Sequence, residues 1–293
     1  TIVFCGMGGS GVTGDIAGAV IEEHGARVKV CKSHKPPAWL GPEDIVVGIS
    51  YSGNTIETIK CVKESLGKGA RVAVVTSGGR LARLAVERSL PLAEVASGFY
   101  PRTAMAEMVG AALGLLSNAY KLDEAMVMEA ASRLKSFHRG RARSIAESLA
   151  GASMVGVVAC GPMGPAARRI RSELAENSKM VAREEVYPES GHNDIVSWQA
   201  SAIEKPGFLM LYWTRDTWCT KLLSGLEPLY RQLGPLAVTI LDSPTLLSAL
   251  LEASLAGGLA SVYLAGLRGV DPRDTSLISR YKESLERLEG SDG

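Results

Sequence analysis

The sequence has few side-chain amides and almost no net charge. Only six of its 293 residues are Asn or Gln, and because thermophilic proteins are depleted of these thermolabile amides, we expect a thermophilic source. The 32 Lys and Arg residues nearly balance the 31 Asp and Glu residues, which leaves a net charge of +1. Such a balance gives no electrostatic footprint for nucleic acid or for an anionic membrane. We therefore expect a small-molecule partner.

Paired cysteines and long apolar runs are also missing. The cysteines form no C-x-x-C pair, which disfavours a zinc site and a secreted disulfide framework. No apolar run approaches the ~18 residues of a membrane span, and no signal-peptide pattern is present. These absences indicate a cytoplasmic protein. Thr1 already lies in an apolar run, so we expect the natural chain to begin earlier. The five cysteines are Cys5, Cys31, Cys61, Cys160 and Cys219.

Short apolar runs alternate along the chain with longer stretches of helical periodicity. This alternation is typical of βαβ units, and hence of parallel sheets flanked by helices. At roughly 100–200 residues per domain, the length predicts two domains. We predict an α/β domain over 1–121, linking helices over 122–149, and a second α/β domain with a C-terminal helical tail over 150–293. The last strongly apolar helix is expected at 245–267.

The two predicted domains look related. "VFCGMGGSG" from Val3 and "VACGPMGPA" from Val158 both consist of a strand, a Cys-Gly pair, a loop and a helix, which makes an internal duplication plausible. The second loop contains Pro162 and Pro165, which lack the backbone N–H groups that an anion would need. If the first loop binds an anion, we expect that its copy does not.

The first loop, "FCGMGGSGVTGDI", fits G-x-G-x-x-G with Gly6, Gly8 and Gly11. Glycines between a strand and a helix let a ligand approach the free N–H groups of the first helical turn. A dinucleotide site also requires an acidic residue at the end of the second strand, and "ARVKVCKSHK" has none there. An NADP site using Lys32 or Lys35 remains an alternative, as does a tight turn without a ligand.

A second motif, "SYSGNTIET" (Ser50 to Thr58), follows the predicted strand "DIVVGIS". Ser50 and Ser52 project from the same side of the strand end, and Thr55 lies in the first helical turn beside unpaired N–H groups. Three hydroxyls around a helix start suit a phosphate monoester. The alternative is a capping box formed by Asn54 and Glu57, which leaves the two serines unexplained.

Together, "GMGGSG" and "SYSGNT" resemble the sugar-isomerase (SIS) domain, a doubly wound, flavodoxin-like α/β fold that binds phosphosugars. "ELAENSK" (173–179), "PESGHNDI" (188–195) and "YLAGLRGVDP" (263–272) are similar to the bifunctional phosphoglucose/phosphomannose isomerases of archaea and some bacteria. The resemblance covers nearly the whole chain. It implies two SIS-type domains and the interconversion of fructose 6-phosphate with glucose 6-phosphate and mannose 6-phosphate, by a homodimer, without a metal or cofactor.

The resemblance also implies roles for particular residues. Glu176 is the expected base that carries a proton between C1 and C2 through a cis-enediol, and otherwise reads as an ordinary helix carboxylate. His192, supplied by the neighbouring subunit, is expected to assist ring opening, and an imidazole suits proton exchange near neutrality. Arg102 is expected near the enediolate, where it would stabilise negative charge. The phosphate is expected on Gly9, Ser10, Ser50, Ser52 and Thr55.

One feature departs from the pattern. Some of these isomerases have a lysine in the last helix that assists ring opening, but this chain has none between 222 and 281. Tyr263 appears at the corresponding position, so it is a possible ring-opening helper. Two other functions remain alternatives: a non-catalytic SIS module that senses a phosphosugar, and the isomerase part of glucosamine-6-phosphate synthase. The first would not need Glu176 and His192 together, and the second needs an amidotransferase half.

Overall fold

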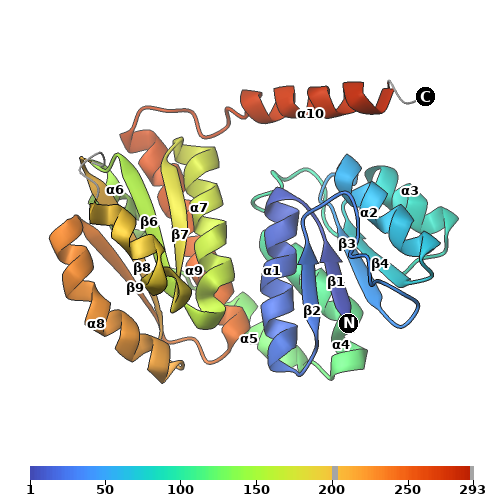
Figure 1. The fold of residues 1–293 in the computed structure, drawn as a ribbon, viewed down its shortest axis with the longest axis horizontal. Helices are drawn as coiled ribbons and strands as arrows, with labels where there is room; N and C mark the ends of the chain where they lie inside the picture. Colours follow the sequence, from blue (N-terminus) through green and yellow to red (C-terminus); the bar gives the residue numbers. More distant parts are fainter. Residues whose placement is uncertain (200–203, 291–293) are drawn as a thin grey trace.

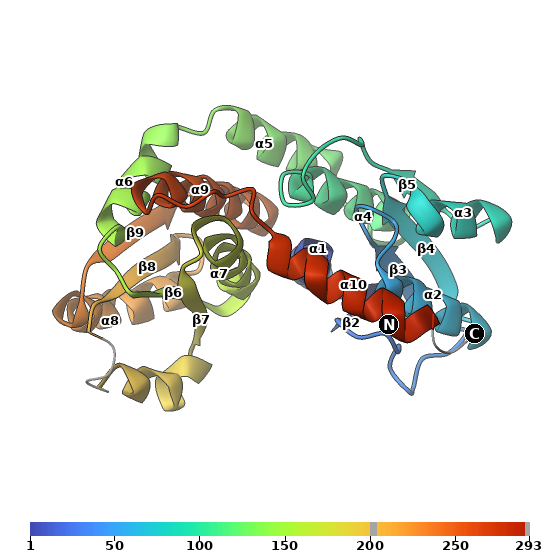
Figure 2. The ribbon, with the colours of Figure 1, turned by 90° about the horizontal axis from the view of Figure 1, so that it is seen from above.

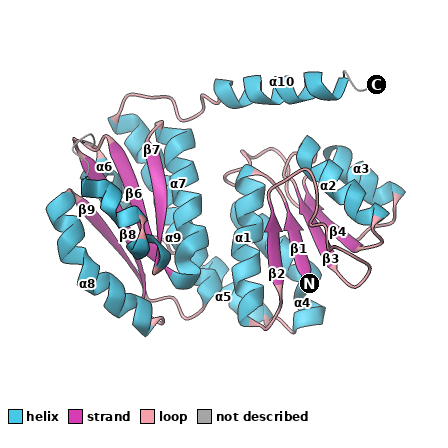
Figure 3. Cartoon of the chain, viewed as in Figure 1, coloured by secondary structure: helices cyan, strands magenta, loops and turns pink. Residues whose placement is uncertain are grey.

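The computed structural model describes residues 1–199 and 204–290 and contains two parallel sheets with helices on both faces (Figures 1 and 3). The last three residues of the predicted second domain, 291–293, lie outside the described residues. The first sheet has the order β2-β1-β3-β4-β5, which is the flavodoxin-like arrangement that the sequence predicts. Its strands are β1 (Ile2–Cys5), β2 (Val28–Cys31), β3 (Ile45–Ile49), β4 (Arg71–Thr76) and β5 (Leu92–Glu94).

The central strands of this sheet are buried on both faces, which explains their continuous apolar sequences. Helices α1 and α4 cover one face and share a core with the second half, while α2 and α3 cover the other face. The helices of this half are α1 (Gly8–Glu23), α2 (Ile56–Gly67), α3 (Gly79–Glu87) and α4 (Met105–Tyr120).

The second sheet has the order β7-β6-β8-β9, which repeats the 2-1-3-4 order of the first. Its strands are β6 (Met154–Cys160), β7 (Val181–Tyr187), β8 (Pro206–Trp213) and β9 (Leu236–Leu241), and its main helices are α7 (Gly164–Ser178) and α8 (Thr217–Leu233). The sequence did not predict β7. This strand lies at the edge of the sheet and carries the charged run Arg183–Glu185, so no apolar run marks it.

Helices α5 (Glu124–Lys135) and α6 (Arg139–Leu149) connect the halves, and both lie within the predicted linking segment 122–149. At the junction, α1 and α7 lie side by side (Figure 1). Each is the helix that follows the first strand of its sheet, so the junction joins equivalent elements of the two halves. The exact division into domains stays a prediction.

Helix α9 (Leu246–Leu267) is long and apolar enough to cross a membrane by length and composition, contrary to the expectation of no such run. It is a core helix in this fold, because it packs against α5, α6 and α7. A helix that is apolar on all sides is typical of a buried position.

A further helix, α10 (Ser276–Gly290), extends from the second half across the first half (Figures 1 and 2). It is the helical tail that the sequence predicts. The Tyr281 hydroxyl donates a hydrogen bond to Glu57 Oε1 in the first turn of α2 (3.2 Å), which attaches the tail to the first half.

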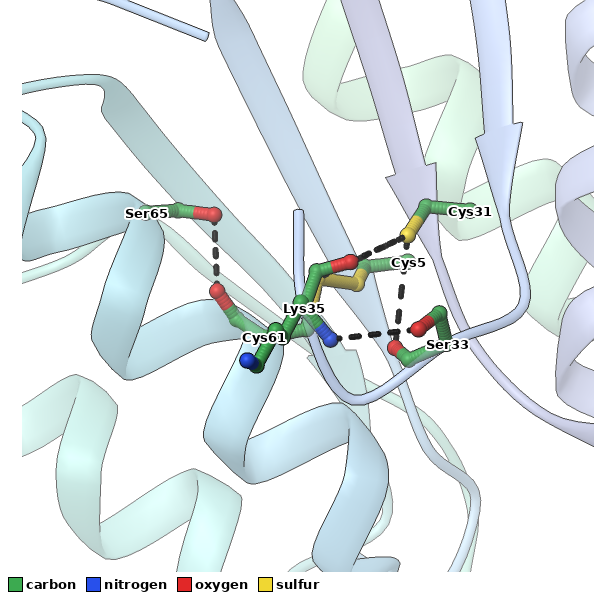
Figure 4. Close-up of a disulfide and its surroundings, with 6 residues drawn as sticks. All are labelled: Cys5, Cys31, Ser33, Lys35, Cys61 and Ser65. Carbon is green, nitrogen blue, oxygen red and sulfur yellow. Dashed lines mark hydrogen bonds between the residues drawn. A yellow bond between two sulfur atoms is a disulfide. The ribbon is translucent and has the colours of Figure 1, made fainter. Parts of the chain in front are cut away.

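A disulfide joins a strand end to a helix in each half, and the sequence, which disfavours a secreted disulfide framework, did not predict either bond. Cys5 bonds Cys61 (Figure 4), and Cys160 bonds Cys219. The partners are 56 and 59 residues apart in sequence, and only the fold brings each strand end to its helix. Cys31 is a buried free thiol with its sulfur 4.0 Å from that of Cys61.

Candidate active site

Helices α1 and α2 begin at the same edge of the first sheet and leave their first-turn N–H groups without a side-chain cap. Met7 and Thr55 occupy the N-cap positions of α1 and α2, but neither side chain accepts a hydrogen bond from its helix. Uncapped helix N-termini attract anions because the free N–H groups and the helix dipole both favour negative charge. The two loops therefore form a site suited to a phosphate.

The predicted hydroxyls meet at this edge. The hydroxyls of Ser50 and Thr55 lie 2.9 Å apart, and Ser10 Oγ accepts a hydrogen bond from the Tyr51 amide (3.2 Å), which ties one loop to the other. Ser52 is exposed, and its hydroxyl accepts the Asn54 amide (3.3 Å). The turn between them needs glycine, since Gly53 has φ +65° and an added Cβ would lie 1.8 Å from the Gly78 carbonyl oxygen.

The structure bears on two alternative interpretations of these motifs. The capping box is not formed, because Asn54 Oδ1 accepts a hydrogen bond from the Arg80 amide (3.1 Å) and Glu57 accepts one from Tyr281. Of the two lysines in the NADP alternative, Lys32 forms an ion pair with Asp15 at 2.5 Å, whereas Lys35 is exposed.

Arg102 and Glu176 form an ion pair between the halves. Arg102 precedes α4, and its Nη1 donates to Oε1 of Glu176, near the end of α7, at 2.6 Å. Arg102 is 11% exposed and Glu176 is 29% exposed, so the pair is partly removed from water yet still open to a ligand. Its guanidinium also lies 4.7 Å from the centre of the Tyr100 ring. A carboxylate held by a fixed cation in such a place is able to move a proton beside a developing negative charge.

Sequence reasoning missed a buried network behind this pair. Arg169 and Glu173 are 3% and 4% exposed and form an ion pair within α7. Asn177 donates to the second oxygen of Glu173 (2.6 Å), and burial raises the pKa of the Glu173 carboxyl although Arg169 opposes this. The i,i+4 spacing of Arg169 and Glu173 was visible in the sequence. The spacing could not indicate that the pair is buried, because the same spacing is common on solvent-exposed helix surfaces.

The C-terminal segment covers the Arg102–Glu176 pair. Arg102 Nη2 donates to the Pro272 carbonyl (3.2 Å), and Lys179 donates to the Asp274 carbonyl (2.7 Å). The predicted helical tail is α10, the last helix of the described residues, and it carries Lys282 next to Tyr281. Lys282 lies just beyond the range 222–281 that has no lysine, so a lysine is present in this helix.

His192 and Tyr263 lie apart from the pair within one chain. His192 is exposed at the end of a short 3-10 helix (Glu189–His192) that follows β7. Tyr263 is half-buried on α9, where the Arg143 guanidinium lies 5.6 Å from its ring centre. The structure brings together Arg102, Glu176 and the phosphate loops, but not these two residues.

The second-half loop differs from the first. It forms a 3-10 turn (Gly161–Met163) with Pro162 inside it, and the nearby N-terminus of α8 is capped by Asp216, whose Oδ1 accepts the Cys219 amide at 2.9 Å. In the second half, the Asp216 carboxylate thus occupies the N-terminus of α8, whereas the equivalent N-terminus of α2 in the first half has no side-chain cap.

Comparisons with known proteins identify the family of the chain. Residues 138–285 match the model of the bacterial phospho-glucose isomerase C-terminal SIS domain. The chain is 36% identical to a bifunctional phosphoglucose/phosphomannose isomerase of Aeropyrum pernix, over 97% of this chain and 88% of the relative. It is 30% identical to the same enzyme of Aquifex aeolicus, over 98% and 90%. In structure it resembles the tagatose-6-phosphate ketose/aldose isomerase of Escherichia coli, with a TM-score of 0.71, 15% identity and coverage of 92% and 83%. The chain belongs to the family of bifunctional phosphoglucose/phosphomannose isomerases.

Proposed function

We propose that this protein interconverts fructose 6-phosphate with glucose 6-phosphate and mannose 6-phosphate by aldose–ketose isomerisation. The observation that carries the proposal is the ion pair of Arg102 and Glu176, which Arg169 connects to Gly9 at the open N-terminus of α1. A phosphate anchor and a proton-transfer pair are the two parts that a sugar-phosphate isomerase needs. The family relationship supports the same substrates.

The phosphate binds at the edge of the first sheet. The backbone at Gly9 and the hydroxyls of Ser10, Ser50, Ser52 and Thr55 donate hydrogen bonds to its oxygens, and the N-termini of α1 and α2 add favourable dipoles. These contacts fix the remote end of the substrate, so that C1 and C2 reach Glu176 in a defined orientation.

Glu176 takes the proton from C1 of the open-chain ketose and returns it to C2. Transfer to one face gives the glucose epimer, and transfer after rotation about C2–C3 gives the mannose epimer. Arg102 stabilises the negative charge on the enediolate oxygen between the two transfers. Its existing contact with Glu176 keeps both groups on the same side of the substrate.

Ring opening involves groups that arrive from elsewhere. We assign it to His192 of a neighbouring subunit in a homodimer, because His192 is exposed and apart from Glu176 within one chain. Lys282 is the better candidate for the second helper than Tyr263. It follows Tyr281, which contacts the first turn of α2, whereas Tyr263 lies against Arg143.

A cytoplasmic location and a thermophilic source remain part of the proposal. The two disulfides do not conflict with them, because intracellular proteins of hyperthermophiles are commonly rich in disulfides.

Separate coupled assays test the function. Purified protein is mixed with fructose 6-phosphate, and glucose 6-phosphate and mannose 6-phosphate are followed independently. We expect both products. Neither product would leave the non-catalytic phosphosugar-binding module as the better account, and glucose 6-phosphate alone would remove the mannose activity.

A further inference from the structure

Arg169 is a buried cation that reaches from the second half to the phosphate loop of the first. It lies on α7, and its side chain is 4% exposed. A Cβ built at Gly9 would come within 3.3 Å of its Nη1 atom, so the guanidinium lies against the backbone at the start of α1. Neither phosphate loop, 6–10 or 50–55, contains a Lys or Arg. Arg169 therefore places a guanidinium, paired with Glu173, directly behind the backbone of the first loop.

The same guanidinium holds the proton-transfer pair. Its Nη2 donates to the backbone carbonyl of Arg102 at 2.7 Å and pairs with Glu173, one turn before Glu176 on α7. Arg102 in turn donates to Glu176. A continuous set of contacts thus runs from Gly9 through Arg169 and Arg102 to Glu176.

Glu173 anchors the set from behind. Its other oxygen accepts from Asn177, which also donates to Ser261 of α9 at 2.8 Å. Arg169 itself contacts α1 at Gly9, the segment before α4 at Arg102, and its own helix at Glu173. A planar guanidinium is suited to such a junction because its donors diverge in a rigid fork. A lysine would keep the charge but not the geometry.

We propose that Arg169 is a positioning residue that couples phosphate binding to proton transfer, by fixing the phosphate loop relative to Arg102 and Glu176. This rests on the proposed function. The phosphate then contributes to kcat as well as to binding, because its anchor and the base are parts of one rigid set. A side chain at position 9 would contact the guanidinium closely, at 3.3 Å from its Cβ, so Gly9→Ala should shift Arg169 slightly.

Arg168 offers a matched control on the same helix. It also reaches the first half, through Asp15 of α1 (3.3 Å), but it is half-exposed and its other partner is Glu184 of β7. Loss of Arg168 therefore removes one contact between the halves without touching the set from Gly9 to Glu176.

The test compares Arg169→Lys and Arg168→Met with the wild type in fructose 6-phosphate kinetics. A double variant, Arg169→Met with Glu173→Gln, removes the cation without leaving a buried carboxylate unpaired, and Glu173→Gln alone is its control. Thermal unfolding of each variant checks the fold. We expect kcat to fall on the order of 100-fold in the double variant, with a smaller fall in Arg169→Lys, and to stay near normal in Arg168→Met.

The outcomes separate this inference from the proposed function. A wild type without isomerase activity would contradict the function itself. An active wild type with folded Arg169 variants that keep kcat, or that change only KM, would contradict the coupling. A loss in Arg168→Met equal to that in the double variant would show that contact between the halves matters, and not Arg169. If the double variant does not fold, Arg169→Lys and Gly9→Ala decide, since both keep a cation beside Glu173 and both should lower kcat.

Discussion

The two halves share strand order and disulfide position but differ at their helix N-termini. In each half, the last residue of the first strand is bonded to the helix that follows the third strand: Cys5 to Cys61 and Cys160 to Cys219. Yet α2 starts at Thr55 without a side-chain cap, whereas Asp216 caps α8. We infer that the same architecture yields an anion site where the N–H donors are left free and a closed helix end where a carboxylate occupies them. On this proposal, function follows from the open helix ends and not from the fold.

The halves also differ beside their disulfides. In the first half a third cysteine, Cys31, approaches the bond, and all three sulfur atoms lie within 4.8 Å of one another (Figure 4). In the second half, the sequence 150–293 contains only Cys160 and Cys219, so no third cysteine lies in that segment. The two disulfides therefore join equivalent elements, but only the first has a third cysteine beside it that could form a replacement bond. This difference allows the two disulfides to be compared by mutation.

The largest expected effect concerns the proton chemistry assigned to the second half. Glu176→Gln keeps the shape of the side chain but removes the base, so we expect kcat to fall by roughly 10²- to 10⁴-fold, the usual contribution of a positioned general base. Binding of fructose 6-phosphate, measured by calorimetry, should persist because the phosphate loops are unchanged. Near-normal turnover would show that another group is the base.

The next largest effect is expected from a substitution that gives α2 the same N-cap residue as α8. Thr55→Asp places a carboxylate where Asp216 stands in the other half, so it should cap α2, fill the open N–H groups and repel the phosphate. We expect KM for fructose 6-phosphate to rise on the order of 100-fold with no loss of thermal stability. Thr55→Asn caps without charge and should have a smaller effect. An unchanged KM in Thr55→Asp would place the phosphate elsewhere.

The third prediction uses the extra thiol. Each native disulfide closes a loop of similar length, and the chain-entropy model gives each about 4 kcal/mol of stability. Cys160→Ala should lose that contribution. Cys5→Ala should lose less after oxidation with oxidised glutathione, because Cys31 and Cys61 then form a replacement bond, giving up two electrons and two protons to glutathione. Denaturant unfolding measures the difference.

The control for this prediction is the double variant Cys5→Ala with Cys31→Ala. It has no replacement partner for Cys61, so its loss should match that of Cys160→Ala. Equal losses in Cys5→Ala and in the double variant, together with free thiols at Cys31 and Cys61, would show that the proximity of 4.0 Å does not lead to bonding.

The smallest effect is expected at the closed helix end. Asp216→Ala removes the cap of α8 and should cost about 1 kcal/mol of stability, as N-cap losses typically do. Steady-state kinetics with fructose 6-phosphate should not change. A raised KM would mean that the second-half loop takes part in substrate binding.

Much of this comparison was predictable from the sequence, and the rest depended on long-range contacts. Apolar runs predicted eight of the nine strands that the described residues contain. The clearest of these runs belong to the central strands, because parallel strands buried on both faces are marked by composition alone. The strand β7 escaped because its charged edge position breaks the run. The proximity of Ser50 and Thr55 followed from local spacing, five residues apart.

The remaining features join residues that are far apart in sequence. The contact of Arg102 with Glu176 spans 74 residues, and both disulfides span more than 50. Residue spacing carries no information at such separations, so only the family resemblance indicated roles for Arg102 and Glu176. The family resemblance indicated no role for Arg169. Its sequence setting predicts an ordinary ion pair on a helix surface, and its burial against Gly9 appears only when the halves are assembled.

The most direct measurement of the central claim is proton exchange during turnover in D2O. Wild-type protein is incubated with fructose 6-phosphate, and the products are examined by NMR. A shared base at Glu176 that exchanges its proton with solvent predicts glucose 6-phosphate and mannose 6-phosphate that both carry deuterium at C2. Deuterium at C2 of only one of the two products, or no products, would contradict a base shared by the two isomerisations.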